Sequence, residues 1–136
     1  MSFDWKYYLD LASELIKFEN PSLREACDRT SVSRSYYAVF GIAKKWLIEK
    51  GESIPFEDSH KFVREKFIAS PKRVEKRIGG DLGKLWLERK DADYEESPCF
   101  DNSRARTFHL MASRVLPLVQ KGLEDVLAAK KSQPSG

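Results

Sequence analysis

The sequence predicts an all-α protein: a bundle of four or five helices forming a single domain over residues 1–130, with a disordered tail over 131–136. Three observations predict this. A chain of 136 residues has the length of one domain. Its composition, 41% hydrophobic and 33% charged, is that of a globular protein with one core. Apolar residues recur three and four positions apart along nearly the whole chain, and no segment alternates with period two over a useful length.

The first two helices are separated by the dipeptide Asn20-Pro21. Apolar spacing predicts a first helix over Asp4–Phe18, and proline disfavours helical backbone in the residue before it. Ser22 and Glu25 then have the spacing of a capping box, which predicts the start of a long second helix. That helix is expected to end near residue 50, where a glycine follows as the stop.

A short third helix and a less regular fourth segment are expected next. Asp58 or Ser59 can cap the third helix. Ser70-Pro71 fits an N-cap followed by proline at the first helical position. Because Gly79-Gly80 disfavours helix, the pattern is weakest over 71–83, and helix is expected to resume at Leu82 and run to about residue 90.

The last part of the chain divides into a loop and a long helix. Residues 91–101 contain Pro98 and five acidic residues, which predicts a loop. An unbroken apolar stripe from Ala105 to Val126 then predicts the clearest helix of the chain, with Pro117 inside it.

Charge is spread unevenly although the net charge is only +3. Residues 60–90 hold 10 basic and 4 acidic residues, whereas residues 91–103 hold no basic and 5 acidic ones. A basic stretch therefore ends in an acidic one. The basic stretch is either a solvated face or a surface for an anionic partner. Its first seven cations are Lys61, Arg64, Lys66, Lys72, Arg73, Lys76 and Arg77.

The sequence gives no sign of export, membrane insertion or metal binding. Charges throughout the first 20 residues do not fit a secretory signal, and no uncharged apolar stretch approaches the ~20 residues of a membrane span. Cys27 and Cys99 are not spaced as metal ligands and are expected to be reduced core thiols. We therefore expect a cytoplasmic protein with no metal and no cofactor.

Three short strings give the chain a family resemblance. They are S-R-S-Y-Y-A-V-F over 33–40, S-H-K over 59–61 and R-K-D-A-D-Y over 89–94. Together they resemble the HEPN superfamily (higher eukaryote and prokaryote nucleotide-binding domains), in its clade of short stand-alone proteins with S-R-x-Y-Y-A and R-x-x-A-D-Y motifs. The resemblance covers roughly residues 5–128. It implies a helical bundle that dimerises, with a cleft across the dimer where nucleic acid binds.

The resemblance also implies a chemistry. Many HEPN proteins are metal-independent ribonucleases, often toxins encoded beside a small nucleotidyltransferase antitoxin. Their hallmark is an arginine, four to six residues, and then a histidine. In this chain Arg89 is followed after four residues by Tyr94, so a tyrosine stands in the place of the histidine. Its ordinary pKa near 10 makes it a poor base at neutral pH.

Three residues are candidates for catalysis. Arg89 can bind a phosphate with two parallel hydrogen bonds. Tyr94 can donate a hydrogen bond or stack on a base. His60 is either the proton-transfer group that Tyr94 cannot be, or a residue of the helix N-terminus bonded to Asp58 or to backbone. His109 also follows an arginine after four residues, but it lies inside the last helix and is expected to be a chance match.

The candidate nucleic-acid contacts are cations and an aromatic ring: Arg34, Tyr37, Lys61, Arg64 and Arg89. Tyr36 and Asp93 are candidates for a structural or docking role. Two alternatives stay open here. Arg89 and Asp93 can form a buried structural pair, and Arg34 can be paired with an acid such as Asp93 instead of binding nucleic acid.

Two functional hypotheses follow. The first is a HEPN-type protein that binds RNA or a nucleotide as a homodimer, ribonuclease-like with weak or lost cleavage, which leaves open whether it is an enzyme. The alternative is a non-catalytic interaction module that docks a nucleotidyltransferase partner through the acidic segment 91–101. In that case Tyr94 is the expected site of nucleotide transfer.

Overall fold

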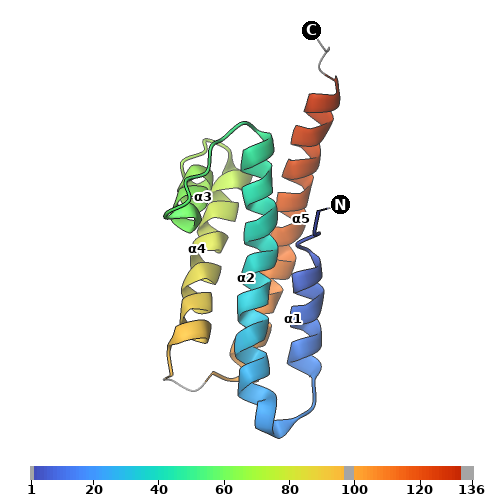
Figure 1. Ribbon diagram of the computed structural model, residues 1–136, viewed down its shortest axis with the longest axis vertical. Helices are drawn as coiled ribbons and strands as arrows, with labels where there is room; N and C mark the ends of the chain where they lie inside the picture. The colour runs from blue at the N-terminus through green and yellow to red at the C-terminus, as the bar shows by residue number, and fades with distance from the viewer. Residues whose placement is uncertain (1, 97–99, 133–136) are drawn as a thin grey trace.

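The computed structural model describes residues 2–96 and 100–132, and this part is all-helical, with five α-helices and a short 3-10 helix. Their bounds are α1 Tyr7–Lys17, η1 Pro21–Leu23, α2 Arg24–Glu49, α3 Ser59–Ile68, α4 Arg73–Tyr94 and α5 Asn102–Ser132. The predicted all-α bundle is thus confirmed. The helices α1, α2, α4 and α5 run along the long axis, and the short α3 crosses beside α4 near one end (Figure 1).

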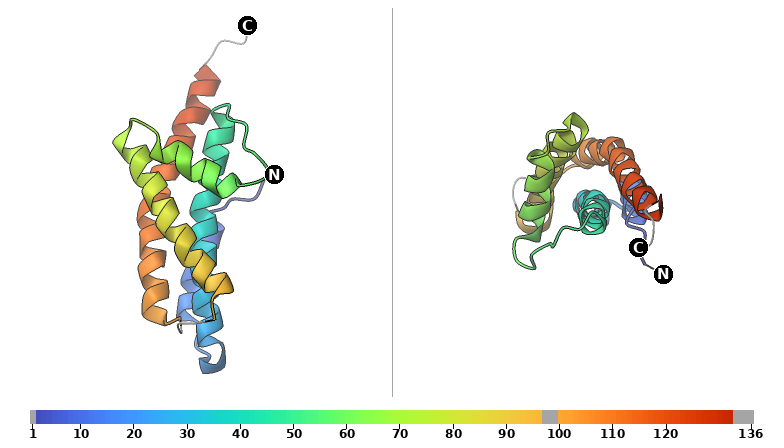
Figure 2. Two further views of the ribbon diagram at one scale, coloured as in Figure 1. Left: turned by 90° about the vertical axis from the view of Figure 1, so that its left-hand side faces the viewer. Right: turned by 90° about the horizontal axis from the view of Figure 1, so that it is seen from above.

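Helix α2 is the central element of the bundle. It packs against α1, α4 and α5, and the view along the long axis shows the other helices arranged around it (Figure 2). The largest buried cluster combines residues of α2, α3, α4 and α5, with Tyr36, Phe67 and Leu85 among its most buried members. A smaller cluster around Val32, Ala92 and Phe100 lies toward the other end of the bundle.

The predicted start of α2 is wrong in its capping residue. The side chain of Asn20 accepts a hydrogen bond from the backbone N–H of Ser22 at 3.1 Å and thereby caps η1. Leu23 occupies the N-cap of α2 and makes no capping hydrogen bond with its apolar side chain. The Ser22–Glu25 capping box therefore does not start the helix. Its predicted end is confirmed, because Gly51 follows with a φ of 103°, which favours glycine.

Helix α4 is continuous through the two glycines that predicted a weak segment. A Cβ on Gly79 would lie 2.6 Å from the backbone nitrogen of Ile68, so the missing side chain lets α3 approach α4 closely. The cost of glycine in a helix is therefore offset by packing that a local pattern does not reveal. The helix also starts later than predicted: the Ser70 hydroxyl accepts from the N–H of Lys72 at 3.2 Å, and Arg73 is the first helical residue.

The prediction of a loop over 91–101 is wrong for its first four residues, because α4 runs to Tyr94. Arg29 on α2 donates to the carbonyl oxygens of Asp91, Ala92 and Glu95 at 3.1, 3.0 and 2.6 Å. These hydrogen bonds satisfy carbonyls that a helix C-terminus leaves open. Arg104 on α5 holds the same turn by its ion pair with Asp91, at 3.0 Å. Residues 97–99, with Pro98 and Cys99, lie outside the described residues.

Two further expectations concern the end of the chain and the thiols. Helix α5 reaches Ser132, so the predicted tail begins later than residue 131, and residues 133–136 lie outside the described part. Cys27 is a buried free thiol, as predicted.

Over the described ranges, no helix combines the length and the apolar character that a membrane crossing requires.

Candidate nucleic-acid interface

Arg89 lies in the last turns of α4 and is nearly buried, with 9% of its surface exposed. Its Nη2 donates a hydrogen bond to the hydroxyl of Tyr37 on α2 at 2.8 Å. Its Nε lies 3.6 Å from a carboxylate oxygen of Asp93, one helical turn further on. This is an ion pair too long for a hydrogen bond, and the buried Nε has no hydrogen-bond partner among the described residues. The guanidinium therefore keeps an unused donor.

Aromatic rings surround the Arg89 guanidinium. Its central carbon lies 5.3 Å from the ring centroid of Tyr37, 5.7 Å from that of Tyr94 and 5.9 Å from that of Tyr36. Rings at such distances attract a cation through their electron-rich faces. Tyr36 is buried, but Tyr94 is 73% exposed and forms the solvent side of the cluster. Tyr94 is therefore the most exposed of the three rings around the cation.

His60 is joined to the same cluster through Tyr36. The Tyr36 hydroxyl lies 2.5 Å from Nδ1 of His60, and the imidazole stacks on Phe40 with ring centroids 4.2 Å apart. Burial lowers the pKa of His60, and the positive charges of Arg89, Lys44 and Arg64 lower it further. The imidazole is therefore neutral at pH 7.

The hydrogen bond between Tyr36 and His60 defines a tautomer. Burial raises the pKa of Tyr36 well above its ordinary value, so the phenol keeps its proton and can donate it to Nδ1. The neutral imidazole then carries its own proton on Nε2. In this state the free nitrogen of His60 is a hydrogen-bond donor, and the basic nitrogen is occupied by a buried phenol.

Arg34 contacts the same Tyr37 ring as Arg89. Its guanidinium carbon is 5.0 Å from the ring centroid of Tyr37 and 4.8 Å from that of Tyr8 on α1. Its Nη2 donates to the Ser33 hydroxyl at 3.3 Å, and that hydroxyl donates to Asp93 at 3.2 Å. Arg34 is thus linked to Asp93 through Ser33, and within the described ranges the direct ion pair of Asp93 is the one with Arg89.

Arg64 and Lys61 are on α3, next to this cluster. The Arg64 guanidinium lies 4.7 Å from the ring of Trp86 on α4, and its buried Nη1 has no hydrogen-bond partner in the part of the chain that the structure describes. The amine of Lys90 lies 4.4 Å from the same ring. Of the predicted contacts, Arg34 and Arg89 are thus joined through the ring of Tyr37. Arg64 is close enough for its charge to act on Tyr36 and His60, and Lys61 follows His60 on α3 with its side chain exposed.

The rest of the basic stretch does not form one surface. Lys66 pairs with Glu52 at 3.5 Å, and Arg77 pairs with Asp81 one turn away at 3.8 Å. Lys72 and Arg73 line a cavity at the opposite end of α4. Besides Arg89 itself, the described residue of this stretch that lies near Tyr36 and His60 is Arg64, whose charge acts on both side chains.

His109 is in a separate environment. Its Nε2 lies 3.3 Å from the carbonyl oxygen of Leu9, and it packs between α5 and α1. It lines a hollow with Ser13 and Arg106 and is not brought to Arg89.

Several residues that build the site carried no signal in the sequence. Arg29 fixes the turn that contains Asp93 and Tyr94, but its contacts span more than 60 residues. The contact of Tyr8 with Arg34 depends on how α1 packs on α2, which the local sequence does not reveal. Phe40 stacks on both Tyr36 and His60, and its position one helical turn after Tyr36 is the sequence signal that could have indicated this.

A comparison with protein-family models and with curated proteins finds no match to this chain. Within 2–96 and 100–132, no three His, Cys, Asp or Glu side chains are grouped as metal ligands. The side chains that form the candidate site are named the Arg89 cluster: Arg34, Tyr36, Tyr37, His60, Arg89, Asp93 and Tyr94.

Proposed function

We propose that the protein is a HEPN-type domain that binds RNA through the Arg89 cluster and has weak or no ribonuclease activity. The observation that carries this proposal is the state of Arg89, a nearly buried guanidinium whose Nε has no hydrogen-bond partner among the described residues. Arginine presents its donors as a rigid fork, so a phosphate displacing Tyr94 can use the free Nε together with a second nitrogen. Arg34, Arg64 and Lys61 add positive charge around it.

The same geometry supports weak rather than efficient cleavage. Metal-free cleavage of RNA needs a base that takes the proton of a 2′-hydroxyl and an acid that protonates the leaving oxygen. The basic nitrogen of His60 is occupied by the Tyr36 phenol, and the place expected for a second histidine holds Tyr94. Among the described residues, the cluster can therefore bind and orient a phosphate and offer the Nε2–H of His60 as a hydrogen-bond donor, but it lacks an accessible base at neutral pH, and a neutral imidazole is not an acid that could protonate the leaving oxygen.

RNA binding is tested with a fluorescein-labelled single-stranded RNA of about 16 nucleotides, followed by fluorescence anisotropy at increasing NaCl. Because Arg89→Ala removes a buried group, we use Arg89→Lys, which keeps the charge but loses the fork. We expect it to weaken binding about three- to tenfold. Lys61→Ala should reduce the salt slope by about one, and the exposed Lys131 on α5 serves as the control. Absence of salt-dependent binding, or equal affinities for all variants, would contradict the proposal.

Cleavage is tested separately, in the presence of a metal chelator. Tyr94→His restores an arginine followed after four residues by histidine, and we expect it to raise the rate of metal-independent cleavage above that of the natural chain. Tyr94→Phe is the control, since it keeps the ring without a titrating group. If the natural chain already cleaves RNA faster than Tyr94→His does, the assignment of weak activity is wrong.

The homodimer expected of a HEPN protein belongs to the same proposal. Sedimentation velocity measures the mass of the complex in solution, and RNA binding should be lost on dilution below the dimer dissociation constant if the cleft spans two copies.

A second candidate function is supported by the exposure of Tyr94. With 73% of its surface open, the Tyr94 phenol is accessible to another protein. A partner nucleotidyltransferase could transfer a nucleotide to it: the phenol oxygen attacks the α-phosphate of a nucleoside triphosphate, loses its proton and releases pyrophosphate. Intact mass after co-expression with such a partner decides this, because Tyr94→Phe must then abolish the mass increase.

A further inference from the structure

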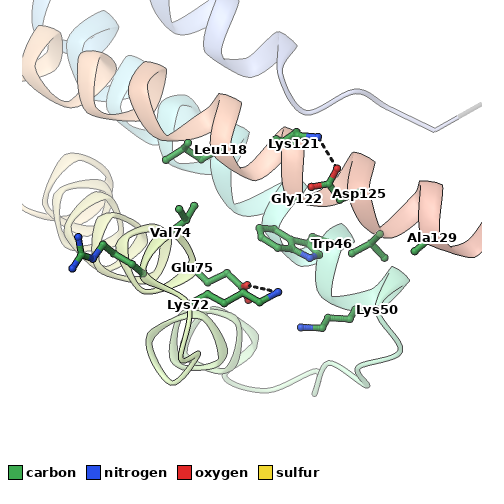
Figure 3. Close-up of a pocket in the computed structure, with 12 residues that line it drawn as sticks. Trp46, Lys50, Lys72, Val74, Glu75, Leu118, Lys121, Gly122, Asp125 and Ala129 are labelled. Atoms are coloured by element: carbon green, nitrogen blue, oxygen red, sulfur yellow. Dashed lines mark hydrogen bonds and ion pairs between the residues drawn. The ribbon is translucent and has the colours of Figure 1, made fainter.

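A cavity with apolar walls lies at the end of the bundle where α2 ends and α4 begins (Figure 3). Its volume of about 470 Å³ is within the range of small-molecule sites, roughly 300–1,000 Å³. Arg73 at its edge and Arg89 are 16 positions apart on α4, about 24 Å at the rise of an α-helix. The cavity is therefore separate from the Arg89 cluster, and what it binds is independent of the proposed function.

The floor of the cavity is fixed by one close contact. The indole of Trp46, at the C-terminal end of α2, packs against α5 at Gly122, where a Cβ would collide with the ring. Trp46 is also held by Phe67, with ring centroids 4.9 Å apart at an angle of 67°. Val74 and Leu118 complete the apolar walls from α4 and α5. This floor is built from packed core residues, so the cavity is preformed.

The rim of the cavity carries an excess of positive charge. Two acids are present, but each already has a cation: Lys121 contacts Asp125 at 2.7 Å, and Glu75 lies 3.8 Å from Lys72 (Figure 3). Lys50 and Arg73 also line the cavity, and neither forms an ion pair with any residue in the described part of the chain. The rim therefore offers two uncompensated cations above an apolar floor.

The chemistry of the walls restricts the body of a ligand. The hydrogen-bonding groups of the described lining residues are the charged side chains of the rim and the indole N–H of Trp46, and no amide or hydroxyl side chain is among them. The apolar walls below the rim therefore suit an apolar ligand body better than a sugar or a nucleobase, whose hydrogen bonds those walls would not meet. An alkyl chain needs no hydrogen bonds, and its binding becomes more favourable with every methylene that leaves water.

We propose that this cavity binds a single-chain amphiphilic anion, a medium-chain carboxylate whose alkyl chain contacts Trp46 and Leu118 and whose carboxylate lies at the rim, where the charges of Lys50 and Arg73 are uncompensated. Apolar walls select the chain, and the two cations select the charge of the head group. Neither feature alone would distinguish such a ligand from a neutral alkane or a simple inorganic anion.

The proposal is tested by isothermal titration calorimetry with decanoate on the full chain, below the concentration at which it forms micelles. We expect one site per chain and an affinity that rises up to about fourfold per added methylene from octanoate to decanoate. Decyltrimethylammonium, with the same chain and the opposite charge, should not bind. Binding that does not depend on chain length, or equal binding of the cation, would overturn the proposal.

Matched variants locate the site. The double variant Lys50→Ala/Arg73→Ala should weaken decanoate binding about tenfold, whereas Lys84→Ala, an exposed lysine of α4 outside the cavity, should not. Val74→Asp places a charge on the wall and should abolish binding, with the exposed Leu87→Asp on the same helix as its control.

Anionic vesicles in place of decanoate test a membrane lipid as the source: if they bind and decanoate does not, the proposal fails. Unchanged binding in both test variants would also overturn it.

Discussion

The phenol of Tyr36 and Nδ1 of His60 lie 2.5 Å apart, between the middle of α2 and the first turn of α3. Tyr36 is buried, so no ligand reaches this nitrogen without moving the tyrosine. His60 is a candidate proton-transfer group in the sequence, but its Nδ1 is engaged in a hydrogen bond inside the bundle. Its remaining proton on Nε2 is the part of the ring that a ligand could use.

Removing the Tyr36 hydroxyl should release His60. In Tyr36→Phe the neutral imidazole loses the donor that stabilises it, so the pKa of His60 should rise toward its ordinary value. We expect the free energy of unfolding to fall by about 1–3 kcal/mol, because Nδ1 is left without its partner. NMR titration of the histidine ring protons measures the pKa, with His109 as an internal reference. An unchanged His60 titration would show that this hydrogen bond is not formed in solution.

The stability of the fold should depend on His60 in mildly acidic solution. Because burial and nearby cations lower the pKa of His60, the unfolded chain takes up its proton at a higher pH than the folded chain does. The free energy of unfolding should therefore fall as the pH drops below about 6.5, the ordinary pKa of histidine. Urea unfolding from about pH 8 to about pH 5 measures this. His60→Gln should flatten the fall, whereas His109→Gln should keep it; identical profiles for His60→Gln and the natural chain would exclude His60 as its source.

Arg29 should hold the end of α4 in its helical form. In Arg29→Ala the carbonyls of Asp91, Ala92 and Glu95 lose a charged donor, which we expect to cost about 2 kcal/mol. Hydrogen exchange should become faster at the backbone amides of residues 92–95. Arg106→Ala removes an exposed arginine of α5 and should change neither. Unaltered exchange in Arg29→Ala would mean that α4 ends at Tyr94 for another reason.

Two glycines should respond to alanine in opposite directions. Gly122→Ala forces a methyl group against the ring of Trp46 and should cost about 1–3 kcal/mol of stability. Gly80 lies on an exposed face of α4 with nothing within 4 Å of a Cβ, so Gly80→Ala should gain about 0.5–1 kcal/mol. Thermal unfolding of both variants decides whether Trp46 packs as closely against α5 as described. Stabilisation by both substitutions would contradict that packing.

The helical class and the long second and last helices could be predicted because their apolar spacing is a local property of the sequence. The bounds of α4 could not. Gly79 disfavours helix locally, but a larger residue would collide with the backbone of Ile68 on another helix. Likewise the acidic residues after Lys90 predict a loop. The arginines that stabilise this turn come from α2 and α5, so the local sequence gives no sign of them.

The candidate site divides in the same way. The strings around Tyr36, His60 and Arg89 could be singled out from the sequence alone. Two contacts of the site could not be predicted, because they depend on how three helices approach one another. The Tyr36 hydroxyl is bonded to Nδ1 of His60, and Arg89 contacts both Tyr37 and Asp93. Of the two alternatives for Arg89, the structure shows the pair with Asp93, whereas phosphate binding stays a prediction that the unpartnered Nε makes testable.

The ring of Tyr37 is shared by two cations, Arg34 and Arg89, and Arg34 is in turn in contact with Tyr8 of α1. Arg34 and Tyr37 of α2 together connect the first helix to the last turn of α4. The Tyr37 ring is also packed against Tyr36, Phe40 and His60, so it holds the two guanidinium groups in a fixed relation to each other. Helix α1 is thereby part of the wall of the Arg89 cluster, and any ligand of Arg89 binds beside the first helix as well as the fourth.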